Sequence, residues 1–393
     1  MVVAVHDRYY GRRHVVAQRE QNPFWWWVSL CVWVVSHLLW PASPRAANEV
    51  VVHMGYYEDN ERLAVLTPSI RAEVDLHERT TLRAQYTYET FDREPPEGVL
   101  DAITGATSVS GGVSGGAEDT RHAVSAGATQ RFGLTALTAG YYFARENDFL
   151  SYAFLVGVTQ ELFLRNLELS AVYRYTDDDI DNLTARPDEV FPRSKATHTF
   201  TVTATQLLSP KMWILGGYSY GYVSGYQSLP QRKVLIPFTI GGVTISEVFD
   251  ETHPDERNRH TIFLRSKRYF LSRTVADLNL FGYFDDWGVK AFATELRLSQ
   301  YLTDDLVLRI RYRFYTQTAA DFYEEVYTQP QEYLTADDRL RAFDAHTAGI
   351  KLTYSLRALG LEDWWISFDY DRYQETNDGL AAHILQGSFR IAF

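Results

Sequence analysis

Basic residues at alternate positions are the strongest chemical signal in this sequence. The basic set spans three segments and comprises Arg265, Lys267, Arg297, Arg309, Arg311 and Arg313. A matching acidic set comprises Glu73, Asp75, Asp369 and Asp371. Alternate residues of a β-strand point to one face. If these faces line one closed sheet, we expect the two sets on separate arcs of a wet interior, with a transverse field that orients dipolar solutes. A salt-bridge network that fills the interior is the alternative.

A second acidic cluster indicates a weak metal site at Asp177, Asp179 and Asp181. The alternation matches the start of a calcium loop, but Asn182 occupies the sixth position, where that loop needs Gly. The helix–loop–helix version is therefore excluded. A looser divalent-cation site, shared with lipopolysaccharide phosphates, remains as the alternative to a solvated acidic loop.

Two further patterns argue against catalysis. Residues 112–116, Gly-Val-Ser-Gly-Gly, have the spacing of a hydrolase nucleophile elbow, but they lie in a Gly/Ser-rich stretch and not between a strand and a helix. The single cysteine, Cys31, lies in the predicted leader, so the mature chain has no thiolate metal site and no covalent haem motif. We expect neither enzyme activity nor a cofactor.

The elements that carry these residues are predicted to be strands, because hydropathy alternates with a period of two from about residue 50 onward. Most of the alternating segments have about 10 to 13 residues, the length that a tilted strand needs to cross a bilayer. The predicted strands, about 16 in number for an even-stranded barrel, cover residues 50–57, 63–76, 80–91, 122–131, 135–145, 151–161, 167–176, 196–207, 212–223, 260–271, 274–284, 289–299, 306–316, 345–357, 363–373 and 380–393.

The connections between these strands alternate in length. Short turns follow the even-numbered strands, and long loops near 92–121, 177–195, 224–259 and 317–344 follow odd-numbered ones. This is the pattern of an all-β, antiparallel transmembrane barrel with short periplasmic turns, and an even strand count places both termini in the periplasm. Tyr and Phe collect at the long-loop end of the strands that run outward, as in an interfacial aromatic belt.

Both ends of the chain carry export signals. Residues 1–47 have a basic segment, an apolar run from Phe24 to Trp40 and small residues near Ala47, which predicts a cleaved signal peptide followed by one barrel domain over 48–393. The last strand alternates apolar residues and ends in Phe389 and Phe393. This ending resembles the signal that the barrel-assembly machinery recognises.

The composition excludes other classes of protein. The formal net charge of −12 argues against nucleic-acid binding, which needs a basic footprint. Aromatic residues make up 15% of the chain, which suits a protein with two lipid–water interfaces. A soluble β-sandwich also alternates, but it has no reason to collect Tyr at one end of every second strand.

Three segments resemble a family of Gram-negative outer-membrane β-barrel proteins of unknown function. They are residues 56–62 (YYEDNER) with the following strand that contains Pro68, residues 101–107 (DAITGAT) and residues 146–152 (ENDFLSY). The resemblance implies a porin-like barrel in the cell outer membrane and supplies no activity.

Two functions fit a barrel of this size. The leading hypothesis is a porin-like channel or transporter for small solutes, because barrels of 16 to 18 strands leave an aqueous lumen. The alternative is a sleeve or scaffold for a periplasmic or lipid-anchored partner protein, with a redox protein as one example. Outer-membrane lipid, lipopolysaccharide and the barrel-assembly machinery are the expected partners in either case.

Overall fold

A computed structural model describes residues 48–393 except 62, 94–118, 183–188, 231, 242 and 377–378. The predicted signal peptide, the Gly/Ser-rich segment 112–116 and the loop segment 101–107 lie outside the described residues. Strands dominate the described part of the chain: β1 (Glu49–Asp59), β2 (Leu63–His77), β3 (Thr80–Arg93), β4 (Asp119–Phe132), β5 (Thr135–Arg145), β6 (Phe149–Leu162), β7 (Leu167–Ile180), β8 (Arg193–Ser209), β9 (Met212–Gly225), β10 (Lys233–Ile240), β11 (Val243–Asp250), β12 (Glu256–Phe270), β13 (Thr274–Asp285), β14 (Lys290–Tyr301), β15 (Leu306–Gln317), β16 (Phe343–Ser355), β17 (Trp364–Glu375) and β18 (Ala381–Ala392).

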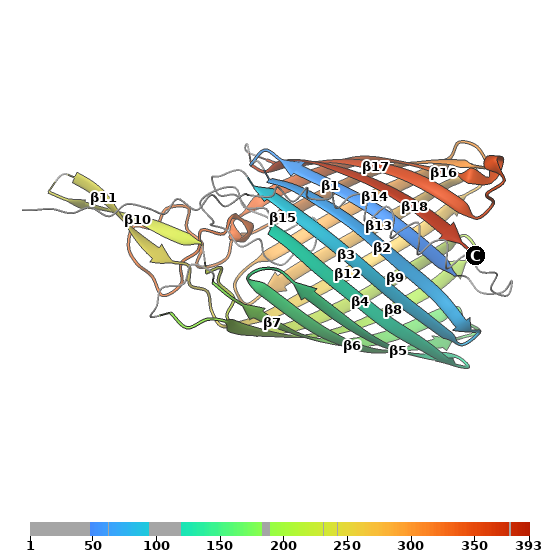
Figure 1. Cartoon of the computed structure of the whole chain (residues 1–393), viewed down its shortest axis with the longest axis horizontal. Helices are drawn as coiled ribbons and strands as arrows, with labels where there is room; N and C mark the ends of the chain where they lie inside the picture. Colours follow the sequence, from blue (N-terminus) through green and yellow to red (C-terminus); the bar gives the residue numbers. More distant parts are fainter. Residues whose placement is uncertain are drawn as a thin grey trace, which may run out of the picture. The chain divides into compact units, whose positions relative to one another are not determined.

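The strands close into one antiparallel barrel (Figure 1). Its order is β1-β18-β17-β16-β15-β14-β13-β12-β9-β8-β7-β6-β5-β4-β3-β2. The barrel therefore has 16 strands, and the predicted fold class is confirmed. β1 and β18 close the ring over eleven residue pairs, from Glu49 opposite Ala392 to Asp59 opposite Ala382.

One predicted loop contains regular structure of its own. Residues 224–259 were predicted to form a long loop, and within this loop β10 and β11 pair as a separate two-stranded sheet. This hairpin lies beyond the end of the barrel (Figure 1). Val234 and Ile236 are buried against Tyr327 and Leu334, which belong to the connection between β15 and β16. Packing between two long loops therefore stabilises the hairpin.

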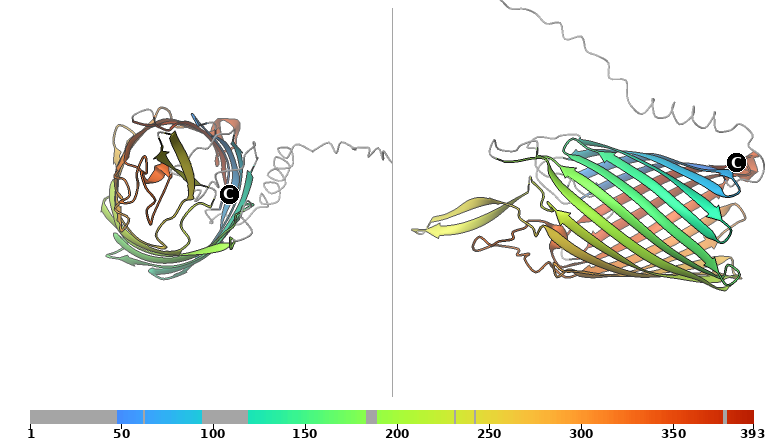
Figure 2. Two further views of the ribbon diagram at one scale, coloured as in Figure 1. Left: turned by 90° about the vertical axis from the view of Figure 1, so that its left-hand side faces the viewer. Right: turned by 90° about the horizontal axis from the view of Figure 1, so that it is seen from below.

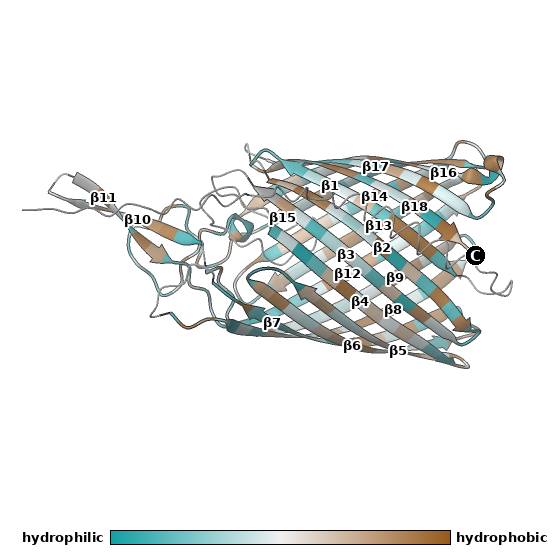
Figure 3. Cartoon of the chain, in the orientation of Figure 1, coloured by the Kyte–Doolittle hydropathy of each residue, from teal (hydrophilic) through white to brown (hydrophobic). Residues whose placement is uncertain are grey.

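The outer wall of the barrel is apolar. Outward side chains such as Phe154, Ile262, Ile310 and Phe368 are more than half exposed, and apolar positions recur along the strands in Figure 3. A closed ladder satisfies the strand backbone internally and leaves no sheet edge, which hydrocarbon requires. The chain is an outer-membrane β-barrel, because only a lipid solvent accommodates so much exposed apolar surface around a closed sheet.

The two ends of the barrel differ. At the end that we name the turn end, short turns join the strands, and the backbone N–H of Phe393 donates to the carbonyl of Asn48 at 3.0 Å. At the opposite end, the loop end, residues 318–342 and the β10–β11 hairpin emerge (Figure 2). That the turn end faces the periplasm remains a prediction. No helix in the described ranges is long and apolar enough to cross a membrane.

Five tyrosine–histidine pairs lie on the outer wall toward the loop end. In each pair the tyrosine Oη lies 2.7 to 2.8 Å from the histidine Nδ1. Each pair joins two strands that are connected at the loop end. The pairs are Tyr86–His122, Tyr173–His198, Tyr218–His260, Tyr312–His346 and Tyr370–His383. Amphipathic rings of this kind suit the border between lipid and water.

Candidate functional site: the lumen

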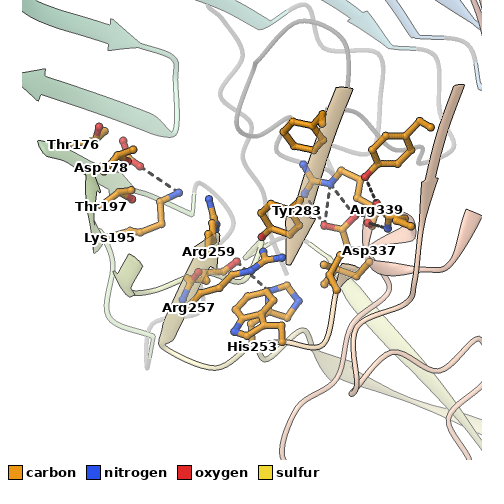
Figure 4. A pocket seen from close by; sticks show the side chains of 18 of the residues that line it. Thr176, Asp178, Lys195, Thr197, His253, Arg257, Arg259, Tyr283, Asp337 and Arg339 are labelled. Carbon is orange, nitrogen blue, oxygen red and sulfur yellow. Dashed lines mark hydrogen bonds and ion pairs between the residues drawn. The ribbon is translucent and has the colours of Figure 1, made fainter. Parts of the chain in front are cut away.

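The main cavity lies inside the barrel near the loop end and has a volume of about 840 Å³. Its wall comes from barrel strands and its cover from three connecting segments, residues 226–232, 251–255 and 318–342, which we name the cap. Figure 4 shows side chains of the wall and the cap converging on this space. The volume is within the usual range of pockets that bind small molecules.

Buried charges hold the cap together. Glu251 accepts hydrogen bonds from Thr335 Oγ1 at 2.7 Å and from the backbone N–H of Leu229 at 3.0 Å. Asp337 lies 2.8 Å from Arg232 Nη1 and 2.6 Å from Arg339 Nη2. Burial alone would raise the pKa of Asp337, but Arg339 and Arg232 hold it well below its usual range. The ion pairs of Asp337 within the cap are therefore intact at neutral pH.

Apolar packing fixes the cap to the wall. Trp287 and Val289, in the turn between β13 and β14, form a buried cluster with Ala320 and Leu340 of the cap. The backbone N–H of Asp321 donates to the carbonyl of Trp287 at 2.8 Å. The segment 318–342 thus lies across the ring of strands at the loop end, as the view along the barrel shows (Figure 2). The sequence predicted a long loop near 317–344, and the structure shows that this segment covers the lumen.

Basic side chains dominate the charge of the main cavity. Seven line it: Arg121, Arg174, Lys195, Arg257, Arg259, Arg313 and Arg339. Four of these have carboxylate partners. Arg121 pairs with Glu89 and Glu146, Lys195 with Asp178, Arg257 with Asp285 and Arg339 with Asp337.

The other three, Arg174, Arg259 and Arg313, have no carboxylate within salt-bridge distance among the described residues. Arg174 lies over the ring of Tyr142 at 5.6 Å, and Arg313 lies over that of Tyr315 at 5.4 Å. Within the described ranges, the positive charge of these three arginines is therefore not compensated by a salt bridge.

A second cavity of about 570 Å³ continues along the wall formed by β3 to β7. Arg71, Arg83 and Gln85 are among its lining residues, and it shares Tyr142 and Arg174 with the main cavity. The two spaces therefore meet at Arg174, which lies between the capped part of the lumen and the wall below it.

The structure pairs the predicted basic and acidic ladders. Arg309 lies 2.7 Å from Asp369, and Arg311 lies 3.0 Å from Asp371. The expectation that the two sets occupy separate arcs is wrong, because only β16 separates β15 from β17. Arginine side chains are long enough to reach across one intervening strand. No transverse field of the expected kind exists along this part of the wall.

The remaining predicted lumen residues have partners that the sequence analysis did not single out. Arg265 donates from Nε to Asp277 at 3.0 Å, and Arg297 pairs with Glu295. Lys267 lies directly opposite Asp277 in the register between β12 and β13. Glu73 pairs with Arg83 at 2.9 Å, and Asp75 accepts from Thr81 Oγ1 at 2.6 Å. Period-two alternation places such residues on the inner face, but only the register between strands reveals the partners.

The structure does not bring Asp177, Asp179 and Asp181 together as a metal site. Alternate residues of β7 point away from Asp178, which is buried and pairs with Lys195 at 3.2 Å. The acidic group that the described residues do assemble is Asp119, Glu146 and Asp148, whose ligand atoms lie within 4.8 Å of one another.

The guanidinium group of Arg121 already lies beside this second acidic group. Arg121 Nε lies 3.3 Å from Glu146 Oε1. Burial, with smaller contributions from the nearby Asp119 and Asp148, raises the pKa of Glu146 to about 8 against the opposing effect of Arg121. Arg121 therefore offsets part of the negative charge of this acidic group.

The residues of the predicted assembly signal lie at the turn end. Phe389 is on the outer face, and its ring meets that of Trp364 edge-on at 5.2 Å. Phe393 follows β18 and bonds to the first described residue, Asn48. These contacts show how the last residues complete the ring, and recognition by the assembly machinery remains a prediction.

Several solved structures resemble the barrel at low sequence identity. A bacterial polysaccharide outer membrane secretin is 8% identical over 88% of this chain and 98% of its own, with a TM-score of 0.49. A BenF-like porin from Pseudomonas fluorescens Pf-5 is 8% identical over 89% of this chain and 99% of its own, with a TM-score of 0.45. A mutant ferric enterobactin receptor from Pseudomonas aeruginosa is 13% identical over 86% of this chain but only 54% of its own, with a TM-score of 0.44.

The sequence comparisons found fewer matches than the structural comparison. No curated protein matches the chain. One family model, described as a protein of unknown function (DUF3570), matches residues 91–389.

Proposed function

Because the chain belongs to the DUF3570 family of proteins of unknown function, we propose its activity from the lumen itself: it is a porin-like channel that passes small solutes across the outer membrane. One observation carries the proposal. Two cavities follow each other inside the barrel and share Arg174 and Tyr142. Barrels of this strand number can hold an aqueous channel, and an inward loop can narrow it to the size of a small solute.

The chemistry of the inner wall supports passage of polar solutes. Thr197 and Thr199 of β8 line the main cavity, and Thr201 bonds to Ser219 of β9 at 2.8 Å on the same face. Hydroxyl groups and charges in a lumen suit water, and they would be costly in a dry core. The cap covers this wall without filling the space beneath it.

Conductance of the purified barrel in a planar bilayer tests the proposal. We expect discrete current steps from protein that keeps the heat-modifiable migration of a folded barrel. A cap variant provides the internal comparison. Asp337→Asn weakens the contacts to Arg232 and Arg339, so it should raise the conductance of each step. Folded protein that inserts and passes no current, in the wild type and in this variant, would refute the channel.

If the barrel were instead a sleeve for a partner protein, the purified barrel would conduct no current. The cap lies across the loop end and encloses a cavity of about 840 Å³, the size for a small molecule and not for a folded domain. A partner threaded through the barrel would need the cap to leave. A stoichiometric partner that co-purifies with a non-conducting barrel would replace the channel by the sleeve.

A further inference from the structure

Four residues form one continuous row across the inner wall below the cap. Arg174 of β7 lies opposite Thr199 of β8, Thr199 lies opposite Gly221 of β9, and Gly221 lies opposite Arg259 of β12. Paired strands are about 4.8 Å apart, so three steps separate the two arginine backbones by about 14 Å. Two long basic side chains thus stand at either end of a short floor of Thr and Gly.

The floor of this row is a recess. Gly221 carries no side chain, and a Cβ built there would meet only the Cβ of Arg259, at 3.6 Å. Thr199 adds one hydroxyl group to the floor and lines the main cavity. The inward residues next to this row are Thr197 and Thr201 on β8 and Ser219 and Val223 on β9, so the described floor holds hydroxyl and apolar groups and no carboxylate.

The acids nearest to the arginines of the row make no salt bridge with them in the described part of the chain. Asp286, close to Arg259, accepts from the backbone N–H of Asn258 at 3.0 Å and from its Nδ2 at 2.7 Å. Asp285 lies opposite Arg259, but its carboxylate accepts from Arg257 Nε at 2.8 Å and Tyr283 Oη at 2.6 Å. The backbone N–H groups of Trp287 and Val289 use its other oxygen, each at 3.0 Å.

The nearest acid on the other side is equally committed. Asp178 is bound by Lys195 at 3.2 Å and Ser151 at 2.7 Å. Arg259 Nε is buried and has no hydrogen-bond partner in the described part of the chain. A buried donor without an acceptor is costly, which indicates that a mobile acceptor completes it.

We infer that the row from Arg174 to Arg259 is a binding site for small dicarboxylates in the lumen. Arg174 lies over Tyr142 of β5, and rotation of its side chain toward β8 would bring the two guanidinium groups, which have no salt bridge among the described residues, to the ends of this floor. There they would match a solute with a carboxylate at each end. Arginine binds carboxylates through short, charge-assisted hydrogen bonds and can do so with two parallel bonds. The recess over Gly221 leaves room for the short carbon chain between them. This inference rests on the proposed channel and names the class of solute that it selects.

Isothermal titration of the purified, detergent-solubilised protein tests the site directly. The probes are succinate, butyrate and succinamide, which have similar size but two, one and no charges. We expect saturable binding of succinate, binding of butyrate that is about tenfold weaker, and no binding of succinamide, because each lost charge-assisted bond reduces affinity by about 10- to 100-fold. Equal binding of succinamide and succinate would overturn the inference.

Variants distinguish a specific binding site from general attraction of anions by the positive charge of the lumen. Arg174→Gln and Arg259→Gln should each weaken succinate binding by at least about tenfold. Gly221→Leu fills the recess and keeps both charges, so it should also abolish binding. The matched control is Arg297→Gln, which removes a lumen arginine that pairs with Glu295 and lines neither cavity. Equal loss in the control would show that general charge, and no site, attracts the anion.

The two proposals fail separately. A barrel that conducts salt but does not bind succinate refutes the dicarboxylate site and leaves the channel intact. A barrel that binds succinate through Arg174 and Arg259 but conducts nothing refutes the channel and leaves the site. Heat-modifiable migration of every variant shows that each measurement is made on folded protein.

Discussion

Replacing Asp369 by Asn removes the carboxylate shared by two lumen cations. Arg309 Nη2 lies 2.7 Å and Lys351 Nζ lies 3.5 Å from Asp369, which is buried. In the described chain neither cation has another carboxylate within salt-bridge distance. They lie directly opposite each other on β15 and β16. Asn has the same shape as Asp, so this change tests charge and not packing.

The expected cost follows from the repulsion that Asp369 now offsets. Two like charges about 5 Å apart repel by about 3 kcal/mol at an effective dielectric constant of about 20. We therefore expect Asp369→Asn to lower the free energy of unfolding by about 3 kcal/mol, a size typical of breaking a buried pair from one side. Urea unfolding in detergent, followed by tryptophan fluorescence, measures this directly.

A matched control and a rescue complete the experiment. Asp304 pairs with Arg273 at 2.6 Å, but its side chain is 80% exposed, so Asp304→Asn should cost no more than about 1 kcal/mol. Adding Lys351→Gln to Asp369→Asn should restore most of the lost stability. If Asp369→Asn is as mild as the control, lumen water screens these charges. The ladder is then part of a conducting wall and not a structural network.

Other perturbations probe orientation, pH dependence, the cap and assembly. On whole cells, Glu332→Cys at the loop end should react with an impermeant thiol reagent and Asp304→Cys at the turn end should not; the reverse pattern would invert the topology. Burial raises the pKa of Glu146 from 4.5 to about 8, so the stability that its protonated form contributes is lost as pH rises between these values. Glu146→Gln should therefore reduce the change of the urea midpoint over this pH range. The same pH dependence in the variant and the wild type would contradict this prediction. Asp337→Asn should raise the rate at which a protease cleaves the cap, and equal rates would mean that the charge network is not what holds it. Deleting Phe393 should reduce the amount of folded barrel in the outer membrane, and normal levels would exclude its role as a signal.

The barrel could be predicted because one physical rule acts on every strand. A wall between lipid and water requires alternation, and the alternating segment predicted at 63–76 corresponds to β2, Leu63–His77. The hairpin β10–β11 lacks this signal. Its first strand reads Lys-Val-Leu-Ile-Pro-Phe-Thr-Ile, with a Pro and without alternation, because it packs on a loop and not in the wall.

The charge pairs could not be predicted from alternation alone. Arg309 and Asp369 are 60 residues apart, and their contact depends on which strands are neighbours and on the register between them. Arg174 and Arg259 were missed for a different reason. Arg174 is the one basic residue of its strand, and Arg259 fell in the segment 224–259 that was predicted to be a loop. The row through Thr199 and Gly221 places the two in relation to each other.

Five of the eight strand pairs that are joined at the loop end share the same tyrosine–histidine contact. Every pair joins an odd member of the ring to the strand that follows it across a loop-end connection, as in β3 with β4 and β15 with β16. The β9–β12 pair keeps this contact although the whole β10–β11 hairpin is inserted between its strands. Adding or removing such a strand pair changes the ring by two strands and leaves both ends of the chain on the same side. Duplication of a hairpin is thus a route by which a barrel of this design can change its diameter without losing closure.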